Sequence, residues 1–277
     1  MLILVTFCLV AKGSLALPPD RAIAFKRAKS LDNGVSISWL EQTWNKDILD
    51  KNVIKGSDFE LLKQLGFKSI RLPVAFVHFG SDNNSMQKVL EHIDETLRFC
   101  KLYGFKLIIC YHSGNLSDNN YLTETPPIIE QWTKLTKRYI QESPDNLFFE
   151  IYNEPPHMDP NIWKDVAYNI TTAIRKIDKN RTLIVGASNF NSIYELSRSV
   201  RMGDDNVIYT FHFYEPFFFT HQGADWVGDQ AATTGVPFPY NERSFPPLNL
   251  KAKNTWGEAN YYQYRSDGNV RSVKDKL

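Results

Sequence analysis

From position 33 onward, short apolar runs alternate along the chain with longer stretches whose apolar residues recur at helical spacing. Runs of this length fit the buried strands of a parallel sheet, and the amphipathic stretches fit the helices that wrap it, so the pattern predicts an α/β fold. The predicted strands are residues 33–38, 67–72, 105–112, 147–152, 182–187 and 207–213. The predicted helices are residues 57–65, 86–103, 127–141, 161–177 and 192–199.

Residues with strong conformational preferences mark the ends of several predicted helices. The run Ser57-Asp58-Phe59-Glu60 has the residue types of a capped helix start, and Gly66 and Gly104 are expected to end two helices. Pro127 is expected to open the third helix, because proline fits a first turn that needs no amide donor.

The pattern changes after the sixth predicted strand. Residues 215–266 show neither period and are rich in aromatic residues and proline, so we expect a long loop that forms a wall of a binding cleft. Residues 269–277 look like the opening of a sixth helix. A TIM (β/α)8 barrel needs two further βα units, roughly 60 residues at the usual barrel length. The sequence therefore predicts an incomplete barrel of about six βα units, with strands seven and eight missing.

Length and charge narrow the class of protein. The chain has 277 residues, of which 43% are apolar, which is enough for one large catalytic domain. Thirty-two basic and thirty-one acidic side chains give a net charge of +1, without the basic stripe that a phosphate backbone requires. We therefore expect no nucleic-acid partner. We also expect the protein to be a monomer.

The first sixteen residues are typical of a secretory signal. Residues 2–10 form a short apolar core, and Ser14-Leu15-Ala16 has the small-x-small pattern that precedes cleavage. Because no basic residue precedes the core and Lys12 interrupts its exit, a buried N-terminal segment is the alternative. We expect residues 1–16 to be removed on export, leaving residues 17–277 as a secreted or periplasmic domain with no segment that spans a membrane.

Cysteine usage gives no strong signal for a disulfide. Cys8 lies in the predicted leader, Cys100 near the end of a predicted helix and Cys110 in the next strand. Two cysteines in a chain of this length are more often core residues than a bridge. We expect a reduced pair, with a Cys100–Cys110 disulfide as the alternative.

Residues 148–156 carry the strongest chemical signal. An apolar run there stops abruptly on Asn153-Glu154, and two prolines prevent the strand from continuing. Alternation along a strand would place Glu154 on the same side as Glu150 and Tyr152. We therefore expect Glu154 at the carboxyl end of a strand, where barrel enzymes hold their reactive groups. A lone Glu-Pro is more often a surface turn, so the other strand ends decide between the two interpretations.

Polar residues also follow other predicted strands. Arg71 ends the second predicted strand and His112 the third. His212 and Tyr214 end the sixth, and because they are two residues apart they face the same side. Buried Arg, His and Tyr usually serve structure, so each alone is weak evidence. Their recurrence at corresponding strand ends predicts one shared site.

These motifs resemble those of glycoside hydrolase family 5, the cellulase family of retaining (β/α)8 barrels, over residues 30–277. The matching motifs are Arg71-Leu72-Pro73, His112, Ile151-Tyr152-Asn153-Glu154-Pro155, Phe211-His212-Phe213-Tyr214-Glu215-Pro216 and Phe219-Thr220-His221-Gln222-Gly223-Ala224. The resemblance implies a retaining hydrolase of β-1,4-glucan that needs no cofactor or metal. β-Mannan and β-1,3-glucan are the nearby alternative substrates.

The resemblance also implies roles for the matching residues. Glu154 would be the general acid and base, with its pKa raised toward the operating pH by burial. Asn153 would hydrogen-bond the sugar's 2-hydroxyl, and His112 would line the sugar subsite.

The second carboxylate is where this chain departs from the family. His212 and Tyr214 would orient that carboxylate, Arg71 would keep it ionised, and it should lie about 5 Å from Glu154. The family supplies it from a seventh strand, but past Tyr214 no acidic residue follows a strand-like apolar run. We therefore expect the nucleophile to be absent, the chain to be a family member truncated at its C-terminus, and its glycosidase activity to be impaired.

Three tryptophans are weaker candidates for substrate binding. Trp44, Trp226 and Trp256 lie in predicted loops, where a flat ring could stack on a pyranose. Most tryptophans are core residues instead. The expected partner is a β-linked polysaccharide or oligosaccharide.

Two other classes of function remain open. A non-catalytic carbohydrate-binding remnant would keep an aromatic cleft without hydrolysing the sugar. A metal-dependent hydrolase would use His112, His212 and His221, but no paired histidine spacing follows the first strand.

Overall fold

The computed structural model describes residues 19–277 apart from positions 46, 81 and 200. The described part of the chain divides into two compact units, the first ending at His212 and the second comprising residues 213–277. The predicted leader, residues 1–16, lies outside the described residues, and so does Cys8. None of the helices that the structure describes has the length and apolar character that a membrane crossing requires.

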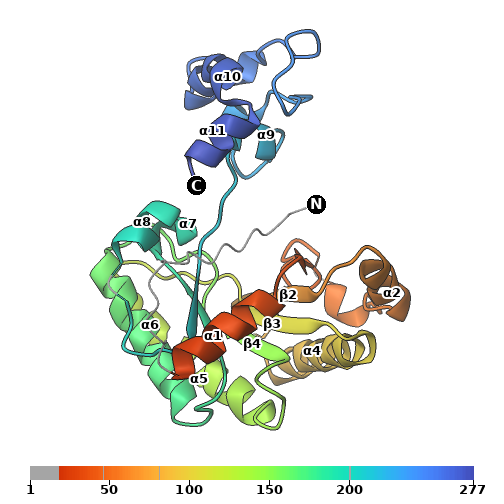
Figure 1. The fold of residues 1–277 in the computed structure, drawn as a ribbon, viewed down its shortest axis with the longest axis vertical. Coiled ribbons are helices and arrows are strands. Elements are labelled where there is room, and N and C mark those ends of the chain that lie inside the picture. The colour runs from red at the N-terminus through yellow and green to blue at the C-terminus, as the bar shows by residue number, and fades with distance from the viewer. Residues whose placement is uncertain (1–18, 46, 81, 200) are drawn as a thin grey trace. The chain divides into compact units, whose positions relative to one another are not determined.

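The first unit is built on a parallel sheet of six strands in sequential order (Figure 1). The strands are β1 Gly34–Ser36, β2 Ser69–Val74, β3 Lys106–Tyr111, β4 Leu147–Glu150, β5 Leu183–Gly186 and β6 Val207–Thr210. Each strand pairs in parallel with the next, as expected when crossovers connect consecutive strands. The sheet curls into a half-barrel, which confirms the predicted incomplete barrel with six strands.

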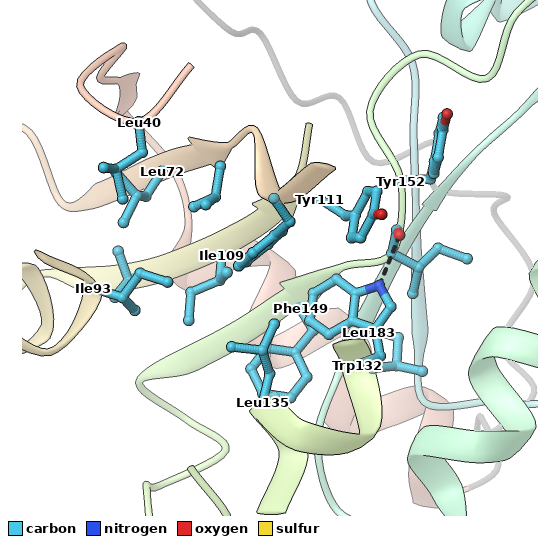
Figure 2. Close-up of a cluster of buried hydrophobic side chains, with 14 of the residues drawn as sticks. Leu40, Leu72, Ile93, Ile109, Tyr111, Trp132, Leu135, Phe149, Tyr152 and Leu183 are labelled. Carbon is cyan, nitrogen blue, oxygen red and sulfur yellow. Dashed lines mark hydrogen bonds between the residues drawn. The ribbon is translucent and has the colours of Figure 1, made fainter. Parts of the chain in front are cut away.

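Helices cover the outer face of this sheet. They are α2 Gly56–Gln64, α4 Asn83–Tyr103, α5 Tyr121–Arg138 and α6 Pro160–Arg175. Shorter elements follow three of the strands: the 3-10 turn η1 Ile48–Asp50 after β1, α3 Phe76–Phe79 after β2, and the turn α7 Ser188–Asn191 with the helix α8 Ile193–Arg198 after β5. Strand residues Ile109 and Phe149 share one buried apolar cluster with Ile93 of α4 and Trp132 of α5 (Figure 2). Trp132 Nε1 donates a hydrogen bond to the carbonyl of Ile151 at 2.9 Å, so its polar edge is satisfied inside the core.

The inner face of the sheet has its own apolar cover, the helix α1 Pro19–Ser30. Ala28 at its end and Leu31 just beyond it pack with one inward-facing residue from each of four strands, Ile108, Phe148, Ile184 and Ile208. The Arg27 guanidinium donates to the Thr182 hydroxyl at 2.9 Å and to Asp145 at 2.7 Å. The sequence pattern did not predict α1, because too few of its residues are apolar to mark a continuous stripe.

Two helix starts differ from those predicted. α5 begins at Tyr121 rather than Pro127, because the carbonyl of Asn120 already accepts the amides of Thr123 and Glu124. The two prolines lie in the second turn, where they remove amide donors without ending the helix. α2 begins at Gly56 with no side-chain cap, so the cap predicted from Ser57 is wrong.

Both described cysteines are buried and free. Cys100 belongs to the outer apolar cluster, the one that contains Ile109, Phe149 and Trp132, and Cys110 lies in β3. The expectation of core residues is confirmed and the disulfide alternative is wrong.

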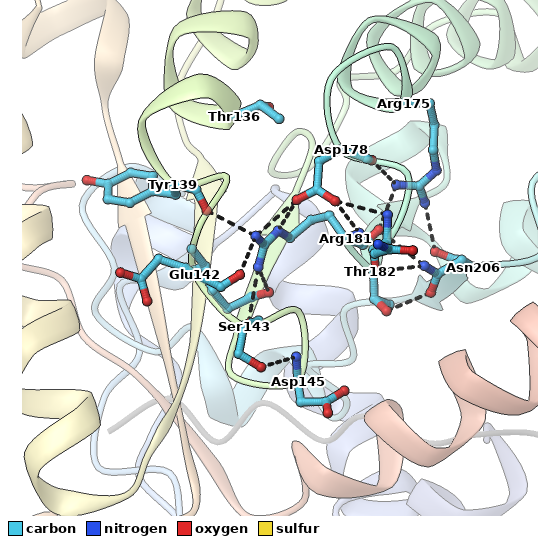
Figure 3. A network of polar contacts seen from close by, with 12 residues as sticks. Thr136, Tyr139, Glu142, Ser143, Asp145, Arg175, Asp178, Arg181, Thr182 and Asn206 are labelled. Carbon is cyan, nitrogen blue, oxygen red and sulfur yellow. Dashed lines mark hydrogen bonds and ion pairs between the residues drawn. The ribbon is translucent and has the colours of Figure 1, made fainter.

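A buried polar network holds the loops that lead into β4 and β5 (Figure 3). Arg181 is 0% exposed and pairs with Asp178. Its guanidinium donates to the backbone carbonyls of Tyr139, Glu142 and Leu147 at 3.1, 2.8 and 2.9 Å. Because these contacts lie at the amino ends of the strands, they serve the fold rather than the face that carries reactive groups in barrel enzymes.

Residues 215–266 were predicted as a long loop, but in the structure they form most of the second unit and contain short helices. The second unit contains α9 Phe217–Thr220, the 3-10 turns η2 Asp229–Ala231 and η3 Leu250–Ala252, α10 Trp256–Asp267 and α11 Val270–Asp275. α11 confirms the helix predicted at the end of the chain. The buried side of α10 consists of Gly257, Tyr261 and Tyr264, at i, i+4 and i+7. A glycine and two tyrosines do not read as an apolar stripe, which is why the prediction failed here.

Candidate active site

Glu154 stands in a turn after β4 rather than on the strand itself. β4 ends at Glu150, and Tyr152 packs in the outer cluster with Trp163, so the predicted alternation does not continue to Glu154. The amide of Asn153 donates to the carbonyl of Tyr111 at 2.8 Å, which ties this segment to the end of β3. Glu154 itself has φ of 44°, the left-handed region that few non-glycine residues adopt. The turn therefore sets the direction of the carboxylate.

His212 holds this carboxylate. The Nδ1 atom of His212 lies 2.6 Å from Glu154 Oε1, a short charge-assisted hydrogen bond. The His212 side chain is 4% exposed and the Glu154 side chain 32%, so the acid faces outward and its partner lies beneath it. Both residues were predicted at strand ends, and the structure brings them together.

The pKa of the Glu154 carboxyl is shifted in the opposite direction from the one expected. Burial alone would raise the pKa of its carboxyl, but the hydrogen bond from His212 and the nearby charge of Arg71 lower the pKa below its ordinary value. The predicted rise toward neutral pH is therefore wrong, and the site as described holds Glu154 ionised.

Arg71 forms a buried ion pair with Glu150 that was not predicted from the sequence. Its Nε and Nη2 atoms contact the two carboxylate oxygens of Glu150, each at 2.7 Å. Nη2 also donates to Asn153 Oδ1 at 2.8 Å and contacts Cys110 Sγ at 3.1 Å. Burial would raise the pKa of Glu150, but Arg71 lowers it below its ordinary value. The sequence did contain a signal for this pair, because Glu150 is a lone acid at an inward position of an apolar strand, and a buried acid needs a partner.

The same pair orients Asn153. Because its amide oxygen accepts from Arg71, the oxygen faces the buried guanidinium, and the NH2 group is the remaining donor. The role predicted for Asn153 toward a sugar hydroxyl stays a prediction. The role predicted for Arg71 toward a nucleophile stays a prediction.

A further acid, Glu41, lies in this site and was not predicted. It follows Leu40, whose carbonyl accepts the amide of Ala75 at 2.8 Å and so extends the pairing of the first two strands. Glu41 Oε2 lies 3.9 Å from His112 Nε2. Burial raises the pKa of Glu41 despite the opposing charge of Arg71. The rule used for the other candidates, an ionisable residue after a strand, would have found it.

His112 lies where it was predicted, after β3. Burial, reinforced by the charge of Arg71, lowers its pKa to about 4, so the ring is neutral at neutral pH. A neutral imidazole has one donor and one acceptor nitrogen, which suits contact with a hydroxyl group.

The remaining predicted residues lie elsewhere. Tyr214, Trp226 and Trp256 belong to the second unit, where the Tyr214 ring contacts His221. Trp44 lies in the loop after β1 and is 75% exposed. Their roles in substrate binding or catalysis stay predictions.

The described residues show neither a metal site nor a seventh strand. Among the described residues, no group of three or more His, Cys, Asp or Glu side chains is placed to hold a metal ion. In the same part of the chain the sheet ends with β6, so it shows no seventh strand from which a second glutamate could project.

The fold and this site together define a half-barrel of the (β/α)8 type, with an acid held over the carboxyl ends of its strands. A family model described as Cellulase (glycosyl hydrolase family 5) matches residues 29–270, so the chain belongs to that family. The membership confirms the resemblance predicted from the motifs.

Individual relatives agree with this assignment. Endoglucanase C of Acetivibrio thermocellus is 33% identical over 216 residues, covering 74% of this chain and 62% of the relative. Endoglucanase 3 of Fibrobacter succinogenes is 29% identical over 279 residues, covering 91% of this chain and 42% of the relative. The chain therefore spans 42% and 62% of the length of these two curated relatives.

Solved structures show the same fold. Endoglucanase Cel5A from Thermotoga maritima superposes with a TM-score of 0.66 at 25% identity, covering 91% of this chain and 89% of that one. Structures of the same enzyme with cellobiose and with mannotriose both superpose with a TM-score of 0.64. The two cover 74% of this chain and 68% of their own, at 29% and 30% identity.

Proposed function

We propose that this chain carries the acid/base part of a retaining glycosidase site of the endoglucanase type, acting on β-1,4-glucan. The observation that carries the proposal is the Glu154 carboxylate, which stands 2.6 Å from His212 Nδ1 above the strand ends. Asn153 and His112 supply hydrogen-bonding groups beside it. Relatives named endoglucanases and a family member bound to cellobiose support the choice of substrate.

In this mechanism Glu154 gives a proton to the leaving glycosidic oxygen and later takes one from water. His212 holds the free carboxylate ionised, so the proton-donating form needs a negative charge nearby. A second carboxylate at about 5 Å would raise the pKa of Glu154 by like-charge repulsion while acting as the nucleophile. Asn153 would donate its amide NH2 to the 2-hydroxyl of the sugar.

The proposal is tested by comparing the protein with Glu154→Gln on carboxymethylcellulose and cello-oligosaccharides. Because the sequence predicts impaired hydrolysis, oligosaccharide binding is measured by calorimetry beside turnover. We expect the variant to lose about 10²–10⁴-fold of any hydrolysis and to keep its affinity, since glutamine preserves the shape of the side chain. Glu60→Gln, on the exposed side of α2, is the matched control and should change neither. A protein that neither binds nor hydrolyses β-glucan would refute the proposal.

One observation favours a second candidate, carbohydrate binding without hydrolysis. His212 keeps Glu154 ionised, which suits a hydrogen-bond acceptor better than a proton donor. Under this alternative, Glu154→Gln would weaken oligosaccharide binding, and turnover would be absent from both proteins.

Substrate linkage and location complete the proposal. The structure of a relative with mannotriose makes β-mannan the first alternative substrate to assay, followed by β-1,3-glucan. We also propose export of the protein, on the composition of residues 1–16.

A further inference from the structure

Three consecutive residues after β5 adopt a left-handed backbone. Asn189, Phe190 and Asn191 have φ of 57°, 60° and 57°. A single asparagine tolerates this region, but a run of three non-glycine residues is unfavourable unless surrounding contacts hold it. Such runs concentrate where a protein needs an exact side-chain position.

The contacts that hold this turn lead to the two central residues of the site. The amides of Asn189 and Phe190 donate to the carbonyls of Pro156 and Pro155, the two residues after Glu154, at 3.0 and 2.8 Å. The amide of His212 donates to the carbonyl of Asn191 at 2.9 Å. The turn therefore joins the Glu154 segment to His212 through the backbone.

The Asn191 side chain makes a second contact with His212. Its Nδ2 atom lies 3.2 Å from His212 Nε2, and the side chain is fully buried. The space that it fills exists because residue 186 is glycine, since a Cβ there would lie 2.0 Å from Asn191 Oδ1. Sequence and packing thus place this amide against the imidazole.

The chemistry of an amide NH2 fixes the proton on the imidazole. An NH2 group only donates, so His212 Nε2 must accept and its proton must lie on Nδ1. We propose that Asn191 is a positioning residue that holds His212 as the Nδ1–H tautomer and so commits it as a hydrogen-bond donor to Glu154. Without it, the ring could carry its proton on Nε2 and turn a lone pair toward the carboxylate.

The competing arrangement is an amide turned by 180°. Asn191 Oδ1 is buried without a hydrogen-bond partner among the described residues. With Glu154 ionised, Nδ1 must donate to the carboxylate, so turning Oδ1 toward Nε2 would require a doubly protonated, charged imidazole. The titratable side chains of Glu150 and His112 also interact electrostatically with His212, and the Arg71 guanidinium acts on both of them. The two arrangements differ in the number of protons on His212, which can be measured.

The test is nitrogen-15 NMR of the histidine side chains at neutral pH, which separates the Nδ1–H, Nε2–H and charged forms. We expect His212 of the full chain to be neutral, with its proton on Nδ1. Asn191→Asp replaces the donor by an acceptor and should drive His212 to the charged form. The same substitution at a neighbouring left-handed position, Asn189→Asp, is the matched control and should leave the ring unchanged.

A second variant guards against loss of folding. Gly186→Ala keeps Asn191 but pushes its amide away from the ring, so His212 should become a mixture of tautomers while circular dichroism stays native. A charged His212 in the wild type, or an unchanged neutral ring in Asn191→Asp, would overturn the proposal. The inference rests on the proposed function only for its effect on catalysis, because the NMR measurement needs no substrate. If hydrolysis is detected, Asn191→Asp should lower kcat by at least tenfold with KM little changed.

Discussion

Removing the carboxylate of Glu150 should destabilise the first unit far more than removing a surface acid. Arg71 and Glu150 are 5% and 2% exposed and joined by two contacts of 2.7 Å, so Glu150→Ala leaves a guanidinium buried without its counter-charge. Breaking a buried pair from one side costs about 3–5 kcal/mol. The total stability of a domain is about 5–15 kcal/mol, so a large part of it depends on this pair.

The assay is urea unfolding followed by tryptophan fluorescence, and two comparisons make it specific. The double variant Arg71→Met with Glu150→Leu should recover most of the loss, because no charge is then left buried. Glu95→Ala removes an acid from the exposed Glu95–Arg98 pair and should leave the midpoint unchanged.

The loss should also depend on pH in a defined direction. The pKa of Glu150 is lowered in the folded protein, so its stabilisation is present at neutral pH and disappears as the pH falls through that lowered value. A cost below about 1 kcal/mol for Glu150→Ala, or a double variant as unstable as the single one, would show that the reasoning is wrong.

Four further outcomes are expected. His212→Ala should raise the pKa of Glu154, measured by carbon-13 NMR titration, because the hydrogen bond that favours the ionised form is lost; an unchanged pKa would contradict the contact. Glu41→Gln should raise the urea midpoint relative to wild type at neutral pH but not in acid, because the raised pKa of Glu41 means that folding disfavours its charge. The same difference between variant and wild type at both pH values would refute this. Because the pKa of His112 is lowered to about 4 from 6.5, its contribution to stability should fade as the pH drops across that interval, and His112→Asn should remove that fraction of the acid sensitivity in urea melts. Arg181→Met should lower the unfolding midpoint while the NMR signals of His212 stay in place, since its network lies at the opposite ends of the strands.

Much of the barrel could be predicted because its signals are local. Each strand is a short apolar run, and α4 ends at Gly104 in the left-handed conformation that the glycine was expected to provide. The elements that were missed lack such signals. α1 is too polar to show a stripe, and the core of the second unit is built from tyrosines and phenylalanines whose burial depends on one another.

In the candidate site, too, some features could be predicted from the sequence and others could not. Glu154, Asn153 and Arg71 could be selected as candidates because a polar residue that interrupts an apolar run can be seen in the sequence. The partners that set their behaviour could not be seen, since the pairing of Arg71 with Glu150 spans 79 residues and that of His212 with Glu154 spans 58. The direction of the pKa shift of Glu154 depends on such contacts, which explains why burial alone gave the wrong sign.

The packing of α1 has a consequence for synthesis on the ribosome. Arg27 finds its hydroxyl partner on Thr182, 155 residues later in the chain. At a synthesis rate of about 5–20 residues per second, roughly 8–30 s pass between the synthesis of Arg27 and that of Thr182. During this time β5 and β6, which supply Ile184 and Ile208 to the apolar contact with α1, have not been made. A chaperone that shields the emerging N-terminal segment should therefore raise the yield of folded protein.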